Sequence, residues 1–129
     1  MAIRIVQLGS PRETDEGLRI GTVRRPPRGV PKRLHAKHDW YDVWLAELAP
    51  SAELLREARS EQDDGESFRR FAKRYRAEMK GSENSRLIDL LAALSHHANF
   101  SVSCYCEREK RCHRSILREL LLERGAKVV

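Results

Sequence analysis

The order of elements at the C-terminal end is the feature that most constrains the fold. Residues 100–105 alternate apolar and polar side chains, as a strand does, and a charged loop follows at 107–111. A helix comes next and ends at Gly125, and its apolar face consists of Ile116, Leu117, Leu120 and Leu121. Residues 127–129 add a short strand. A strand, a helix and a second strand form a βαβ-like unit, so we expect an α/β fold with a mainly parallel sheet.

The N-terminal part predicts two more strands and a long loop. Residues 3–8 and 18–23 are short apolar segments bounded by turn residues, which is typical of strands. Residues 24–39 contain three prolines and a glycine, which interrupt both strand pairing and helices. Long ordered loops carry function more often than short connectors do, so this loop is a candidate binding segment.

Between that loop and the last strand we expect helices. Trp and Leu recur at helical spacing over residues 40–48, and Ser51 can cap a helix over 51–59. Residues 61–66 are polar and turn-like. An amphipathic helix then extends from about Phe68 to near Gly81. A further helix begins at Ser82 or Asn84 and ends around 96–99.

Size and composition favour one small cytoplasmic domain. A chain of 129 residues is long enough for a single core, so we expect one compact, three-layer-like domain over 1–129, with helices flanking the sheet. No apolar run reaches the roughly 20 residues of a membrane span, and the N-terminus lacks a signal-peptide pattern. Three clustered cysteines suit reduced thiols better than a secreted disulfide framework.

The charge distribution predicts an anionic partner. The formal net charge is +6, and residues 17–38 contain no acidic side chain. That segment carries seven basic side chains, which are Arg19, Arg24, Arg25, Arg28, Lys32, Arg33 and Lys37. Positive potential attracts phosphates and nucleic acids, so the partner is a small anionic ligand or a nucleic acid. The sequence predicts neither a particular cofactor nor an oligomeric state.

The richest local chemistry lies in residues 104–115, which hold three thiols, an imidazole and four basic side chains. If Cys112 begins the last helix, free backbone N–H groups and Arg114 favour its thiolate and also bind an anion. Cys112, Cys104 and His113 are therefore the candidate catalytic residues. Adjacent side chains on a helix diverge by about 100°, so adjacency alone does not make His113 the base for Cys112.

Three other interpretations of the cysteines stay open. Free cysteines are often buried, so these thiols can simply fill the junction between strand and helix. They can also bind zinc together with His113, but the usual C-x₂₋₄-C pairs are absent and we assign no metal ligand. A reversible disulfide between Cys106 and Cys112 is the remaining alternative.

Two segments carry a resemblance to a known family. The first contains Gly17, Arg19, Arg24 and Pro27-Arg28-Gly29, and the second contains Cys104 and Cys112-His113-Arg114. In this order, over nearly the whole chain, they resemble the YeaO-like branch of DUF488, a family defined as a domain of unknown function. The resemblance implies a compact α/β fold, with one half-site at Arg19, Arg24, Arg28 and Gly29 and the other at Cys104, Cys112, His113 and Arg114. The resemblance also implies three differences: many relatives have aspartate where this chain has Val23, tryptophan where it has Pro26 and glutamate where it has Cys106.

Three functions follow as hypotheses. The first is an enzyme or binder of a small phosphorylated or nucleotide-like anion, in which Arg19, Arg24, Arg28, Gly29 and Arg114 bind the charge and Cys112 is the nucleophile. The second is a nucleic-acid-binding module in which the same arginines contact phosphates without chemistry. The third is a thiol redox or zinc-binding regulator.

Overall fold

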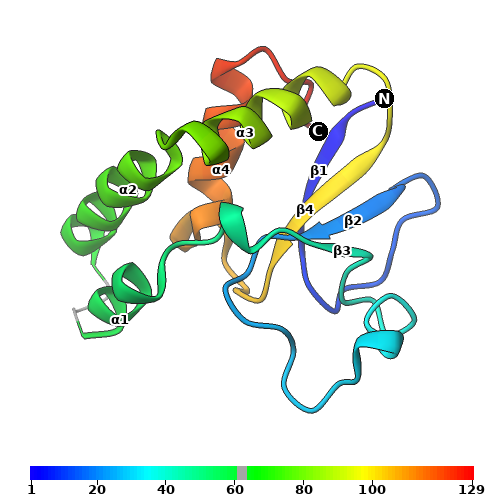
Figure 1. Cartoon of the computed structure of the whole chain (residues 1–129), viewed down its shortest axis with the longest axis horizontal. Helices are drawn as coiled ribbons and strands as arrows, with labels where there is room; N and C mark the ends of the chain where they lie inside the picture. The colour runs from blue at the N-terminus through cyan, green and yellow to red at the C-terminus, as the bar shows by residue number, and fades with distance from the viewer. Residues whose placement is uncertain (61–63) are drawn as a thin grey trace.

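The computed structural model describes residues 1–60 and 64–129. Its centre is a four-stranded parallel sheet in the order β1-β4-β2-β3 (Figure 1). The strands are β1 Ile3–Gln7, β2 Leu18–Gly21, β3 Val43–Trp44 and β4 Phe100–Cys104. The α/β class and the parallel sheet predicted from the sequence are confirmed.

Strand β4 lies in the middle of the sheet. It pairs with β1 from Ile3↔Phe100 to Gln7↔Cys104 and with β2 on its other side, so all five of its residues are buried. Its polar residues are satisfied internally, because the Ser101 hydroxyl donates to Glu16 and the Ser103 hydroxyl donates to the Ile20 carbonyl. The alternation in the sequence therefore separates two buried faces rather than a core face and a solvent face.

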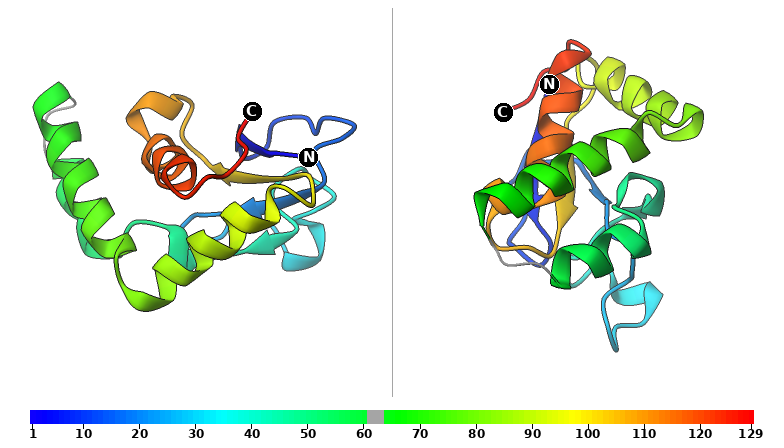
Figure 2. Two further views of the ribbon diagram at one scale, coloured as in Figure 1. Left: turned by 90° about the horizontal axis from the view of Figure 1, so that it is seen from above. Right: turned by 90° about the vertical axis from the view of Figure 1, so that its left-hand side faces the viewer.

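Within the described residues, four α-helices pack together on one side of the sheet (Figures 1 and 2). They are α1 Ala52–Ser60, α2 Gly65–Met79, α3 Ser82–Leu94 and α4 His113–Glu123. Their apolar side chains form one core with Ile3, Ile20 and Val102 of the sheet. The segments around residues 9–17 and 22–42 run along the other side of the sheet (Figure 1). No helix among the described residues has the length and apolar character needed to cross a membrane.

The helix caps agree with the sequence in part. The Ser51 hydroxyl accepts from the Leu54 N–H, as the cap interpretation requires. Asp64 and Ser67 form a capping box at the start of α2, so the predicted turn at 61–66 is wrong at Gly65 and Glu66, and residues 61–63 lie outside the described part of the chain. The N-cap of α3 is Gly81, which lies one residue before the first expected cap, Ser82, and three before the second, Asn84.

The predicted helix over residues 40–48 is wrong. Val43 and Trp44 form the edge strand β3, and a 3₁₀ turn follows at Ala46–Leu48. Tertiary contacts outweigh the helical spacing here, because the Trp44 indole donates to the Val23 carbonyl at 2.7 Å and the Leu45 N–H donates to Gly21. Tyr41 packs directly over Gly21, where a Cβ atom would collide with its ring.

Two other segments match their prediction. Residues 24–39 are irregular apart from a 3₁₀ turn at Lys32–Leu34. At the C-terminus, Val128 forms a parallel bridge with Ile3, which extends the sheet by a single residue pair.

Candidate functional site

A pocket of about 450 Å³ opens beyond the carboxyl ends of β2 and β4. Parallel strands end at one edge, where open α/β sheets bind their ligands. The pocket is lined by the sheet edge, helices α1 and α2, and residues 104–112, which we call the cysteine loop. The lining residues are Val23, Arg24, Arg25, Pro50, Leu55, Ala58, Arg59, Ser67, Phe68, Phe71, Cys104, Tyr105, Cys106, Arg111, Cys112 and His113.

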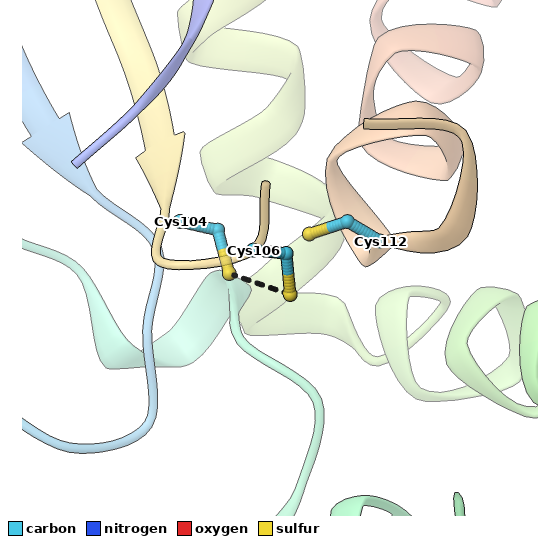
Figure 3. A group of neighbouring side chains, drawn as sticks. All are labelled: Cys104, Cys106 and Cys112. Carbon is cyan, nitrogen blue, oxygen red and sulfur yellow. Dashed lines mark hydrogen bonds between the residues drawn. The ribbon is translucent and has the colours of Figure 1, made fainter. Parts of the chain in front are cut away.

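All three cysteines of the chain meet in this pocket (Figure 3). Cys104 ends β4, Cys106 lies two residues further in an exposed turn, and Cys112 is the N-cap of α4. The Cys104 and Cys106 Sγ atoms are 3.9 Å apart, and all three sulfurs lie within 4.8 Å of one another. Cys104 and Cys112 are buried, with exposed fractions of 6% and 2%.

Hydrogen bonds to the framework hold the cysteine loop in this shape. The Leu8 N–H donates to the Cys104 carbonyl at 2.8 Å, which ties the end of β4 to the segment after β1. Arg114 donates to the Cys106 carbonyl at 2.6 Å. Arg118 forms a two-point ion pair with Glu109, at 2.7 and 3.0 Å, in the turn before Cys112. The thiol arrangement therefore depends on α4 as much as on β4.

His113 contacts Cys112 directly. Its Nδ1 atom lies 3.6 Å from Cys112 Sγ, and its Nε2 atom lies 2.7 Å from the Thr22 carbonyl. A carbonyl only accepts, so Nε2 carries a proton and Nδ1 of the neutral ring is free to accept one. The sequence argument that these neighbours diverge is wrong, because Cys112 has an extended backbone (φ −122°, ψ 153°) and stands outside the helix.

The thiols influence one another's protonation. Hydrogen bonds from Cys104 and then Cys106 lower the pKa of Cys112 against the opposing effect of burial, and His113 lowers it further. The hydrogen bonds to Cys106 and Cys112, followed by burial, raise the pKa of Cys104. Cys112 is therefore the sulfur of this cluster that gives up its proton first.

Four arginines line the same pocket. Arg24 is fixed to the body by donating to the Pro50 and Ala49 carbonyls at 3.0 and 3.1 Å. The Arg111 guanidinium lies 5.9 Å from the centre of the Phe68 ring and donates to the Asp64 carbonyl. Arg25 and Arg59 are exposed. Phe68 and Phe71 stack at 5.9 Å and form an apolar wall.

A comparison with protein-family models identifies the family of this chain. A family model named DUF488-N3a and described as the active DUF488-N3 subclade matches residues 3–125. The chain belongs to the DUF488 family. Searches of curated proteins and of solved structures found no similar protein. Val23 and Cys106, two positions at which the resemblance implies a difference from many relatives, both line the pocket.

The structure places the predicted DUF488 site residues in three different surroundings. Cys104, Cys112, His113 and Arg24 line the pocket, whereas the exposed Arg28 and Gly29 are not among its lining residues. Arg114 lies behind the cysteine loop, is 3% exposed and has an Nε atom without a hydrogen-bond partner among the described residues.

Arg19 lies away from the pocket and has a partner inside the chain. It is fully buried, and its guanidinium donates to both Glu16 carboxylate oxygens at 2.7 and 3.0 Å. The same guanidinium also donates to the carbonyls of Ser10 and Asp39. The anionic partner expected for a buried arginine is thus Glu16.

Sequence reasoning missed the helical side of the pocket. Arg59 stands at the end of α1 and Phe68 in the first turns of α2, and both face the cysteine loop across the cavity. The signal in the sequence was weak, because Phe68 belongs to a stripe that reads as ordinary core and Arg59 to an ordinary charged helix end.

Proposed function

We propose that this DUF488 domain binds a small organic anion in the pocket and that Cys112 is its nucleophile. The observation that carries the proposal is the position of the Cys112 sulfur in a pocket lined by four arginines. The description of the matching family as an active subclade agrees with a catalytic role.

The lining favours a ligand with an apolar body and a charged end. Phe68 and Phe71 offer a face for a flat ring or an alkyl group, and Tyr105 adds a further aromatic side chain. Guanidinium groups bind carboxylates and phosphates through paired hydrogen bonds. A small phosphorylated or nucleotide-like compound has both parts, so we propose this class as the ligand.

The proposed chemistry is nucleophilic attack by sulfur. His113 Nδ1 accepts the Cys112 thiol proton, and the sulfur lone pair forms a bond to the electrophilic atom of the ligand. The leaving group departs with its bonding electron pair and takes up the proton that His113 Nδ1 accepted from Cys112. Arginines at the pocket stabilise negative charge that develops on the ligand.

The test compares two alkylating reagents of similar size, anionic iodoacetate and neutral iodoacetamide, with the rate at each cysteine read by peptide mass spectrometry. We expect the iodoacetate-to-iodoacetamide rate ratio at Cys112 to be higher in the folded protein than in the same protein in urea. Arg25 is exposed and its charge is screened by water, so its effect on the anionic reagent is at most about 1 kcal/mol, and Arg25→Gln should lower the ratio by up to about fivefold.

Two variants serve as controls. Arg33→Gln removes a charge from the same loop at an exposed residue outside the pocket lining, and should leave the ratio unchanged. Arg28→Gln tests the site implied by the family resemblance, and a fall as large as that of Arg25→Gln would move the site outward to the loop. Reaction at Cys106 alone would contradict Cys112 as the nucleophile.

Nucleic-acid binding is a second candidate because of the basic loop. Five basic residues of this loop are exposed, namely Arg25, Arg28, Lys32, Arg33 and Lys37. None of them forms an ion pair with another described residue. Phosphate contacts from several such residues give an affinity that falls steeply with salt. If this candidate holds, Lys32→Gln weakens binding to single-stranded or duplex nucleic acid and lowers the salt dependence, whereas Cys112→Ser changes neither. Salt-independent binding would contradict it.

A further inference from the structure

We propose that Cys104, Cys106 and Cys112 together bind one thiophilic metal ion, of which Zn²⁺ is the representative, with three thiolates as ligands. The inference starts from the positions of the three sulfurs and is supported by the side chains that surround them. It therefore stands or falls independently of the organic anion and of Cys112 as a nucleophile.

The sulfur spacing matches a tetrahedral metal. With Zn–S bonds of about 2.3 Å, two sulfurs on a tetrahedral zinc lie about 3.8 Å apart. The Cys104 and Cys106 sulfurs are 3.9 Å apart, and no pair in the cluster exceeds 4.8 Å. The remaining adjustment is within about 1 Å.

The chain can make that adjustment at one ligand while the other two stay fixed. Cys104 belongs to the central strand and Cys112 caps α4, so both are set by the framework. Cys106 is exposed and lies in the turn between them, where its side chain can move toward the other two. Its carbonyl is bound by Arg114, which keeps the turn in place while the thiolate rotates.

The surroundings suit an anionic metal centre with one open position. Three thiolates and Zn²⁺ carry one negative charge in sum, and Arg24 and Arg111 line the same pocket. His113 touches Cys112 but is not one of the group whose ligand atoms all lie within 4.8 Å of one another. The fourth position therefore faces the pocket and takes a water or an oxygen of a bound molecule, as in zinc sites with three protein ligands.

Metal binding and nucleophilic chemistry exclude each other at Cys112. A sulfur lone pair donated to zinc is not free to attack an electrophile, so zinc should slow alkylation at all three cysteines together. The pocket thus has a metal-bound form with protected thiols and a metal-free form with a reactive one.

The test is a titration of the reduced protein with Co²⁺, followed by displacement with Zn²⁺. We expect saturation at one equivalent, visible bands of a tetrahedral cobalt site and a thiolate charge-transfer band of the intensity of three sulfurs. The chain has three cysteines, so that intensity assigns the site without ambiguity. Cys106→Ser, at an exposed residue, should keep the fold and weaken Zn²⁺ binding by at least about 10-fold to 100-fold. His96→Gln, an exposed histidine outside the pocket lining, is the control and should change nothing.

The absence of charge-transfer bands, or an intensity of only one or two thiolates, would overturn the proposal, as would unchanged affinity in Cys106→Ser. Cobalt binding without anion preference in the alkylation experiment refutes the proposed anion pocket alone. Anion preference without cobalt binding refutes the metal site alone.

Discussion

The buried ion pair between Glu16 and Arg19 predicts a large loss of stability when one partner is removed. Arg19→Met deletes four hydrogen bonds from a side chain with no solvent exposure and leaves the Glu16 carboxylate without its cation. Breaking a buried pair in this way costs about 3–5 kcal/mol in the free energy of unfolding. For a domain of this size the melting temperature should fall by roughly 10–20 °C.

Urea denaturation followed by circular dichroism measures this effect. The matched control is Arg4→Met, because Arg4 of β1 pairs with Asp15 at 2.8 Å but with exposed fractions of 31% and 67% for the two side chains. An exposed pair contributes about 0–1 kcal/mol. The reasoning is refuted if Arg19→Met costs less than about 1 kcal/mol with an unchanged m-value. Arg19→Lys, which keeps the charge, should fall between the two variants.

Three further predictions concern stability. Burial disfavours the ionised Glu16, but hydrogen bonds from Arg19 and Ser101 outweigh it and lower the pKa of Glu16. The resulting stabilisation is present above about pH 4.5, the pKa of the unfolded carboxyl, and is lost on acidification. Below that pH, the free energy of unfolding should therefore fall less steeply in Glu16→Gln than in the unmodified protein. Gly17→Ala, with φ +77° and a new Cβ that meets the Asn99 carbonyl oxygen, should cost at least about 2 kcal/mol in urea denaturation, and Gly29→Ala, with φ +71° and open space, only about 1 kcal/mol; equal costs would refute the packing argument. Tyr75→Phe removes the hydroxyl that donates to the buried Leu48 carbonyl at 2.7 Å and should cost about 1–3 kcal/mol by the same assay, and a neutral result would mean that this carbonyl finds another donor.

The elements that the sequence predicted well are those set by local patterns. The stripe of Phe68, Phe71, Tyr75 and Met79 gave α2, and the alternation after Phe100 gave β4, because each pattern matches the period of its own element. The segment 40–48 failed because its aromatic residues satisfy partners on β2, which the sequence does not bring near.

The site shows the same division. The cysteine loop was found because its residues are close in sequence, whereas the wall from α1 and α2 depends on how these helices pack. Arg19 was expected to bind a ligand anion. In the structure it pairs instead with Glu16, three residues away in the sequence, and both side chains are buried. Cys112 and His113 contact each other because Cys112 lies just outside the helix. The spacing of apolar residues does not locate the end of a helix to within one residue, so the sequence could not predict this contact.

The most direct test of the central claim is protection of Cys112 by a bound anion. The alkylation rate of Cys112 by iodoacetamide is measured with increasing concentrations of a nucleoside monophosphate, of the nucleoside alone and of inorganic phosphate. We predict that the monophosphate slows the reaction in a saturable way at a lower concentration than either part, because it fills the aromatic wall and the arginine end of the pocket together. Rapid alkylation of Cys112 that none of the three slows would contradict an organic-anion site at this sulfur.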